Sequence, residues 1–287
     1  MMDVLERTLM TISCADCAAI PKVADAGRVI SSPDGSIQVM HNGLKVVAGG
    51  YYGDWMTHVI RALRGHHEPQ EELLFNQIID STRNNSLFVE LGSFWSYYSL
   101  WYLHSVPGSR AICVEPDPAN LELGRRNVTL NGFANRVGFY QAYIGEVALE
   151  GCPFRTESTQ EQVILPCFNM DRIRELSNDQ TVEVLHIDAQ GAELGFLQSM
   201  RGAVAAGAVR FLVVSTHHSS ISGSKTTHQD CVRAIRAMNG TVLAEHDVQE
   251  SFSGDGLIIA SFFEQDRNLA MPVISRNVAR NALFPEP

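Results

Sequence analysis

From residue 86 onward, short apolar runs alternate with segments of helical periodicity. Helices are predicted over residues 94–104, 117–132 and 191–200, between apolar runs of strand length. Strands that are apolar throughout and alternate with helices are typical of a parallel sheet covered on both faces. The predicted strands are LFVEL (87–91), AICVE (111–115), RVGFYQAYIG (136–145), VEVLHID (182–188) and VRFLVVST (209–216).

The sequence after the fifth run predicts how the sheet ends. A helix over residues 227–238 is followed by TVLAEHDV (241–248) and GLIIASFF (256–263), which we interpret as an antiparallel pair. An insertion over about 147–180 is expected to hold a short hairpin and then the helix DRIREL. The segment after residue 265 is rich in Asn, Arg and Pro, so we expect it to be loosely held.

The first eighty residues follow a different pattern. Short alternating runs around residues 37–39 and 44–46, separated by turn residues, predict a small β-meander, and helices are expected over 54–64 and 70–80. We therefore divide the chain into an N-terminal β-rich cap (1–64), an α/β domain with a doubly wound, mostly parallel sheet (65–265) and a C-terminal tail (266–287).

The charge of the chain limits its partners. The formal net charge is −10 and no cluster of Lys or Arg is present, which disfavours nucleic acids and anionic membrane surfaces. The longest apolar stretches have strand length, and acidic residues stand near the start where a signal peptide would be basic. A cytoplasmic protein is the expectation.

Six cysteines are present, and two of them, Cys14 and Cys17, form a C-x-x-C pair. No second pair or histidine pair follows at zinc-ligand spacing, so two free thiols are expected, with a redox or metal role as the alternative. The other four lie in apolar runs and are expected to be reduced core residues.

Two strand-end carboxylates, with a glycine turn between them, suggest a nucleoside site. Glu90 and Glu115 each lie at the end of an apolar run, and Glu115 follows Gly92 by 23 residues, near the roughly 20 expected for an acid that binds ribose. A dinucleotide site would need G-x-G-x-x-G, but the loop has one glycine, followed by Phe94 and Trp95. A methyl donor such as S-adenosylmethionine, which has a cationic sulfonium and no pyrophosphate, fits these residues better.

These motifs resemble the FkbM-type methyltransferases over about residues 65–262. The stretches that carry the resemblance are VELGSFWSYYS, VEPDPANLELGRRNVTLNG, HIDAQGAELGFLQSM and the entry segment HEPQEE at 67–72. The resemblance implies a class I, Rossmann-like methyltransferase fold whose last strand is antiparallel. It also implies S-adenosylmethionine as cofactor and O-methylation of a sugar or natural product.

The chain departs from the family pattern at several positions. Glu90, Ser93, Phe94 and Ser96 stand where the family usually has Asp, Ala, Asn and Gly. Outside that loop, His186 and Gln190 stand where the family has Lys and Glu, and the fifth strand ends in STHH. Donor binding is therefore expected to be retained, while the acceptor chemistry stays open. The alternative function is a binding or scaffold protein that kept the fold and lost catalysis.

The resemblance and the strand ends together give a set of candidate site residues. Asn120 could contact adenosine or face solvent, and Tyr143 could lie on adenine or pack in the core. Asp188 is expected to hold the donor's amino group or to orient the acceptor. The full set of predicted donor-binding residues is Glu90, Gly92, Ser93, Glu115, Pro116, Asn120, Tyr143 and Asp188.

The predicted catalytic residues are Asp188, His217 and His218. Methyl transfer to a hydroxyl requires a proton acceptor near neutral pH, and His217 is assigned that role, with one histidine of the pair facing the cleft and the other facing solvent. No metal is expected, although a divalent ion on Asp188 and these histidines is an alternative.

Further expectations concern the cap and the partners. His66, His67 and Glu68 precede the sheet and either close over the donor or acceptor or form a capped loop. The acceptor is expected to be a small molecule, a sugar or secondary metabolite, and the cap could support a homo-oligomer.

Overall fold

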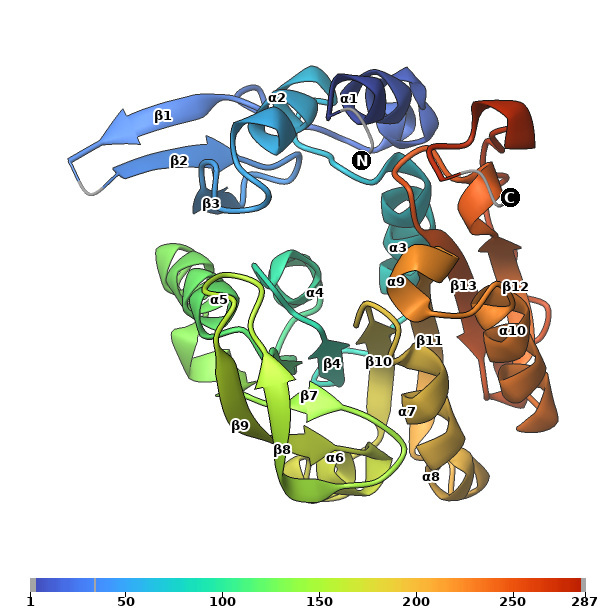
Figure 1. Cartoon of the computed structure of the whole chain (residues 1–287). Coiled ribbons are helices and arrows are strands. Elements are labelled where there is room, and N and C mark those ends of the chain that lie inside the picture. The colour runs from blue at the N-terminus through green and yellow to red at the C-terminus, as the bar shows by residue number, and fades with distance from the viewer. Residues whose placement is uncertain (1–3, 34, 285–287) are drawn as a thin grey trace.

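The computed structural model describes residues 4–33 and 35–284 and has a seven-stranded sheet at its centre (Figure 1). The strand order is β12-β13-β11-β10-β4-β5-β6, and β13 is antiparallel to both of its neighbours. The predicted class I methyltransferase fold with an antiparallel last strand is confirmed. The strands are β4 (Leu87–Leu91), β5 (Arg110–Val114), β6 (Val137–Tyr140), β10 (Val182–Ile187), β11 (Val209–Thr216), β12 (Thr241–His246) and β13 (Gly256–Ser261).

Helices cover both faces of this sheet, as apolar strands require. On one face, Phe88, Val184 and Phe211 share a core cluster with residues of α3 (Pro69–Asp80) and α4 (Tyr97–Ser105). The same cluster extends to α2 (Asp54–Ala62) in the N-terminal segment. The other face packs against α6 (Met170–Leu176), α7 (Glu193–Ser199), α8 (Arg201–Ala205) and α10 (Thr227–Ala237). Glu90 and His186 follow Phe88 and Val184 by two residues, so they lie on the first face.

The helix after β4 begins later than predicted. The sequence predicts it from residue 94, but α4 starts at Tyr97 because Phe94 and Ser96 have left-handed backbone conformations, with φ of 39° and 58°. Seven consecutive residues of α4 are buried, in agreement with its apolar character all round.

The third predicted strand is split in two, so the prediction of one strand over 136–145 is wrong. Strand β6 ends at Tyr140 because its neighbour β5 ends at Val114. The carbonyl of Tyr140 accepts the last hydrogen bond between them, from the backbone N–H of Glu115. The chain then turns, and β7 (Tyr143–Ile144) joins a separate small sheet. That sheet contains the predicted hairpin, β8 (Leu149–Arg155) and β9 (Gln162–Phe168).

The N-terminal segment lies across the end of the large sheet (Figure 1). It contains the predicted meander and one helix that the sequence did not suggest, α1 (Val4–Ser13). Asn127 lies in α5 (Pro118–Leu130), and Asn131 is the C-terminal cap of that helix. The side-chain oxygen of Asn127 accepts a hydrogen bond from the backbone N–H of Val47 at 2.8 Å, and that of Asn131 accepts one from Lys45 at 2.9 Å. These amides attach the meander to the domain. Its strands are β1 (Val29–Ser32), β2 (Gly35–Val39) and β3 (Lys45–Val47).

The C-terminal tail is held more firmly than its composition suggests. Ser275 donates its hydroxyl to Asp16 at 2.5 Å, and its carbonyl accepts a bond from Gln70 at 2.8 Å. Asn277 is buried and donates its backbone N–H to the carbonyl of Glu250. The expectation of a loose tail is therefore wrong for residues 266–277, and residues 285–287 lie outside the described part of the chain.

Cys14 and Cys17, both in the N-terminal segment, are free and buried. Burial raises the pKa of both thiols to about 12, which makes them unreactive at neutral pH. Among the described residues, no helix combines the length and the apolar character needed to cross a bilayer.

Candidate active site

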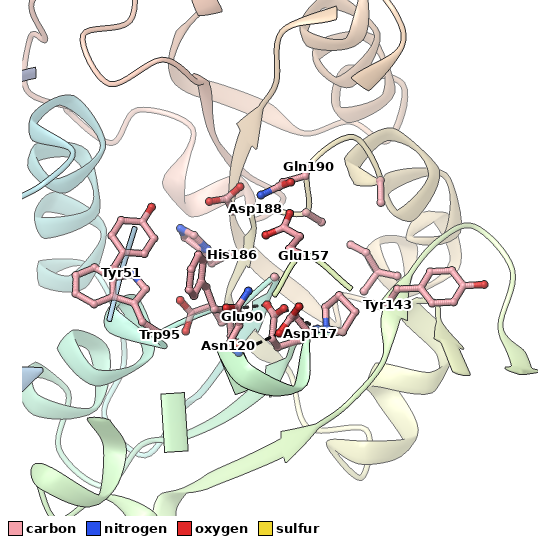
Figure 2. A pocket seen from close by; sticks show the side chains of 18 of the residues that line it. Tyr51, Glu90, Trp95, Asp117, Asn120, Tyr143, Glu157, His186, Asp188 and Gln190 are labelled. Carbon is pink, nitrogen blue, oxygen red and sulfur yellow. Dashed lines mark hydrogen bonds between the residues drawn. The ribbon is translucent and has the colours of Figure 1, made fainter. Parts of the chain in front are cut away.

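A cavity of about 570 Å³ opens at the carboxyl ends of β4, β5 and β10, where an α/β sheet normally binds its ligand. Tyr51 and Tyr52 of the cap form part of its wall. Figure 2 shows side chains from the cap, from the strand ends and from the β8–β9 hairpin around one space. All eight residues predicted to bind the donor line this cavity: Glu90, Gly92, Ser93, Glu115, Pro116, Asn120, Tyr143 and Asp188.

Gly92 lies where the loops after β4 and β10 meet. Its φ is +78°, and a Cβ atom at this position would be 1.7 Å from the carbonyl oxygen of Asp188. The backbone N–H of Gly92 donates to Val114 at 2.9 Å. A side chain at residue 92 would therefore push the two loops apart, and only glycine permits this close approach.

Glu115 is a buried carboxylate with a fixed orientation. Its two oxygens accept hydrogen bonds from the backbone N–H groups of Phe94 and Asp117, each at 2.9 Å. The side chain is only 5% exposed, and burial raises its pKa to about 7 despite these bonds. The neighbouring Asp117 caps α5 through Ala119 and Asn120, so its carboxylate has a structural role.

Glu90 has a similar environment on the adjacent strand. One oxygen, Oε2, accepts bonds from the backbone N–H and the hydroxyl of Ser99 in α4. The side chain is 3% exposed, and burial raises its pKa to about 7. The hydroxyl of Ser93, in the same part of the cavity wall, is buried and has no hydrogen-bond partner among the described residues.

The two ends of the cavity differ in their lining. At one end, Tyr143 and Phe154 form a stacked pair with ring centroids 6.0 Å apart, and Asn120 and Pro116 also line the cavity. At the other end, the rings of Tyr51 and Trp95 stack at 4.5 Å with an angle of 6° between their planes. The sequence gave no sign of the second pair, because Tyr51 lies in the cap, far from any strand end of the sheet.

A smaller cavity of about 290 Å³ adjoins the first and shares Asp188 with it. The wall common to both comes from the cap, the hairpin and the end of β10. The lining of this smaller cavity is Arg7, Tyr51, Tyr52, Glu157, Asp188, Gln190, His217, Ile221, Asp255 and Phe284.

His217 lies against three carboxylates in the smaller cavity. Its Nδ1 is 2.9 Å from Glu193 Oε1, and its Nε2 is 3.1 Å from Asp188 Oδ1 and 3.8 Å from Asp255 Oδ1. Burial disfavours the charged ring, but the carboxylates of Asp255, Asp188 and Glu193 outweigh burial and raise its pKa well above the usual range. Both ring nitrogens are thus engaged by carboxylates, which does not favour His217 as a proton acceptor, and the general-base role of this residue stays a prediction.

His218 does not enter either cavity. The ring is half-buried, its Nδ1 accepts a bond from the backbone N–H of Ser220, and it stacks on Phe284 with centroids 5.4 Å apart. The expectation that one histidine of the pair faces the cleft agrees with this arrangement. A metal site built from Asp188 and both histidines does not agree with the structure, because His218 lines neither cavity.

The entry segment before α3 forms a buried ionic network. Glu72 contacts His66 through Oε2, while its Oε1 accepts the backbone N–H of His67 at 2.7 Å and lies 2.6 Å from Nδ1 of that ring. The ring of His41, from the cap, stacks on His66 with centroids 4.2 Å apart. His67 and Glu68 line the large cavity, whereas His66 lies behind them.

Comparisons with known proteins identify a family for this chain. The Methyltransferase FkbM domain family matches residues 84–240. No curated protein matches significantly. Among solved structures, the methyltransferase FkbM from Methylobacillus flagellatus KT is 17% identical, with a TM-score of 0.47. The match covers 73% of this chain and 61% of that one.

A second similar structure is the O-methyltransferase from Bacillus cereus in complex with SAH. It is 16% identical, and the match covers 67% of this chain and 79% of that one, with a TM-score of 0.38. The family match includes β4, the Gly92 loop, both strand-end carboxylates and Asp188, and it spans more than half of the chain. The protein therefore belongs to the FkbM methyltransferase domain family.

Proposed function

We propose that this protein is an S-adenosylmethionine-dependent methyltransferase that methylates a hydroxyl group of a small molecule, a sugar or another natural product. The observation that carries the proposal is the pair of adjoining cavities with Asp188 in their common wall. A reaction between two small molecules needs space for both of them and, for a hydroxyl acceptor, a polar group where they meet.

The large cavity suits the methyl donor in size and charge. Its volume of about 570 Å³ falls within the range of about 300–1,000 Å³ usual for small-molecule sites. Glu90 and Glu115 offer carboxylates to the cationic and hydroxyl groups of the donor, and the unpaired hydroxyl of Ser93 offers a further polar contact. When bound, the donor supplies a methyl group already activated on a sulfonium.

Asp188 is the residue best placed to act on the acceptor. Its carboxylate contacts the imidazolium of His217, which Glu193 holds from the opposite side. We infer that Asp188 accepts the proton of the acceptor hydroxyl and that His217 is a positioning residue. Because methyl transfer is an in-line displacement, most of the rate enhancement is expected from holding the acceptor in line.

The small cavity suits a polar acceptor with a flat face. Tyr51, Tyr52 and Phe284 offer ring surfaces, while Asp188 and Asp255 offer hydrogen-bond acceptors for hydroxyl groups. A volume of about 290 Å³ has room for one sugar ring or a group of that size.

Donor binding is the first test. We expect S-adenosylmethionine and S-adenosylhomocysteine to bind in calorimetry and NAD not to bind. At a ligand concentration of a hundred times Kd, binding should raise the free energy of unfolding by about 2.7 kcal/mol. Glu115→Ala should weaken binding roughly ten- to hundredfold, because hydrogen bonds to a charged group are lost. Glu122→Ala, at an exposed position of the same helix α5, is the matched control. Equal affinity in both variants would show that Glu115 does not bind the donor.

Turnover then distinguishes an enzyme from a binding protein that lost catalysis. The protein should release S-adenosylhomocysteine when offered a mixture of hydroxylated acceptors, and Asp188→Asn should stop that release. A protein that binds the donor and never releases this product in any extract would favour the binding or scaffold function.

A further inference from the structure

Asp255 is a carboxylate that faces the small cavity without a hydrogen bond of its own. It lies immediately before β13 and lines the small cavity but not the large one. Its Oδ1 is 3.8 Å from Nε2 of His217, and its Oδ2 is 3.8 Å from Nη2 of Arg7. Both distances exceed those of hydrogen bonds, and within residues 4–33 and 35–284 no other group donates one to this carboxylate. Asp255 is therefore free to bind a ligand.

The two bases beside Asp255 are held by other groups. Nε2 of His217 lies closer to Asp188, at 3.1 Å, than to Asp255. Arg7 donates its Nε to the carbonyl of Ser253 at 2.9 Å, which fixes its guanidinium. Neither base therefore satisfies Asp255, although both contribute their charge to its surroundings.

The small cavity has more acids than bases in its lining. The acids are Glu157, Asp188 and Asp255, and the bases are Arg7 and His217. Burial raises the pKa of Asp255 to about 6, although the charges of His217 and Arg7 act in the opposite direction. The bases thus compensate the negative charge only in part, and a cationic ligand would stabilise the ionised acids.

Aromatic side chains beside these acids also suit a cation. Tyr51, Tyr52 and Phe284 line the same cavity, and the side chain of Tyr52 is 41% exposed. An ammonium group that binds a carboxylate next to a tyrosine ring can gain a cation–π attraction as well. A neutral hydroxyl group would gain neither the charge compensation nor this attraction.

Resting on the proposed function, we propose that the acceptor is an amino alcohol, such as an amino sugar, whose ammonium group binds Asp255 while its hydroxyl group lies at Asp188. Both carboxylates face Nε2 of His217, so they are close enough to bind two groups of one small molecule. Asp255 is in this assignment a specificity-determining residue.

The same arrangement determines which group is methylated. Asp188 belongs to the walls of both cavities, whereas Asp255 belongs only to the small one, so the hydroxyl meets the donor and the amine does not. A bond forms between the methyl carbon and the hydroxyl oxygen, the carbon–sulfur bonding pair stays on sulfur, and the hydroxyl proton passes to Asp188. The ammonium group keeps its protons and has no lone pair, so it does not react.

Matched acceptors test the requirement for a cation. Amino sugars, aminocyclitols and aminocyclohexanols are offered with S-adenosylmethionine before and after acetylation of their amines, together with the corresponding diols. Release of S-adenosylhomocysteine should show a kcat/KM roughly ten- to hundredfold higher for the free amines, as expected for a charge-assisted hydrogen bond. Mass spectrometry of the product should locate the methyl group on oxygen.

Variants at residue 255 test the assignment itself. Asp255→Asn keeps the size and removes the charge, so KM for the free amines should rise roughly ten- to hundredfold and the preference over acetylated amines should be lost. The affinity for S-adenosylhomocysteine should not change. Asp255→Glu keeps the charge and should keep the preference. Asp230→Asn is the matched control, because Asp230 is 27% exposed against 22% for Asp255, pairs with Arg233 and lines neither cavity.

The outcomes separate this assignment from the proposed function. If the protein does not bind S-adenosylhomocysteine, the proposed function fails and the assignment fails with it. If it binds, and the acetylated amines or the diols serve as well as the free amines, only the assignment is overturned; this comparison uses the wild-type protein and needs no variant to fold. Donor binding without turnover of any of these acceptors, or methylation on nitrogen, also overturns it. So does a folded Asp255→Asn protein that keeps the wild-type preference for free amines.

Discussion

Single residues in the loop after β4 carry unusual backbone conformations. Phe94 and Ser96 are left-handed, and the resemblance to the family predicts Asn and Gly at these positions, residues that adopt this conformation more readily. The sequence alone could identify the departures but not their conformational meaning. Strain of this kind persists where the surrounding structure fixes it, and Phe94 lies in the wall of the large cavity.

Gly92 gives the sharpest prediction at this scale. Gly92→Ala should lower the free energy of unfolding by several kcal/mol and abolish donor binding, because the new Cβ would overlap the backbone of Asp188. Gly202→Ala in helix α8 is the matched control, since its Cβ would meet open space and helical Ala is favoured by about 1 kcal/mol. Thermal unfolding of both variants is the measurement. A Gly92→Ala protein as stable as wild type would contradict the close approach.

The strand-end site residues could be predicted because of a simple geometric rule. Parallel strands end at one edge of the sheet, so Glu90, Glu115 and Asp188 had to lie near one another. Tyr51 and Asp255 gave no comparable signal, and His186 was noted only as a departure from the family pattern. Their places depend on the cap, on the packing of α3 and on the antiparallel strand, which are tertiary features that periodicity does not encode.

At the scale of elements, the ionic network before α3 fixes the entry segment to the domain. Glu72 is fully buried, and burial acts against its charge, but the charges of His66 and His67 lower its pKa well below the usual range. The same network raises the pKa of His67 to about 10, against the effect of burial. A carboxylate in this position is expected to contribute to stability.

Glu72→Gln should therefore lower the free energy of unfolding by about 3–5 kcal/mol, since it leaves the buried charge of His67 without this partner. The contribution should be complete above the unfolded pKa of 4.5 and be lost as the pH falls through the lowered folded pKa of Glu72. Glu175→Gln, in an exposed pair with Arg172 on α6, should change stability by less than about 1 kcal/mol. Denaturant titration at pH 7 checks both values, and a series of pH values from 4.5 downward follows the loss of the Glu72 contribution. A pH-independent effect across that series would contradict the ionic explanation.

The elements themselves were largely predictable, and the failures have physical causes. Continuous apolar runs mark the central strands of the sheet because both faces are covered. The third run was predicted as one strand because periodicity cannot show where the neighbouring strand ends. The last residue of β5, Val114, pairs with Tyr140, so Gln141 has no partner in β5. Helix α1 escaped prediction since its buried side depends on the C-terminal segments that pack against it.

At the scale of the whole molecule, the large cavity combines acids that are poised to change charge. Burial raises the pKa of Glu90 and Glu115 to about 7, so each holds part of a proton near neutral pH. A cationic or hydroxyl-bearing ligand stabilises the ionised form and lowers those pKa values. Donor binding should therefore be linked to protons.

We expect proton release when S-adenosylhomocysteine binds at pH 6.5, and an affinity that rises as the pH increases from about 6 to 8. Calorimetry in two buffers with different ionisation enthalpies measures the number of protons released. Glu90→Gln and Glu115→Gln should each reduce that number. Proton uptake, or no buffer dependence at all, would contradict the assignment of these carboxylates to the donor.

The contact between helix α1 and residues 252–253 can form only after most of the chain has been synthesised. Thr11 and Arg7 bond to the carbonyls of Phe252 and Ser253, which follow them by 241 and 246 residues. At roughly 5–20 residues per second, the ribosome needs on the order of 10–50 seconds to make that span. A nascent chain stalled before residue 250 already carries the lining of the large cavity, residues 51–192, but lacks Asp255 and Phe284 of the small one.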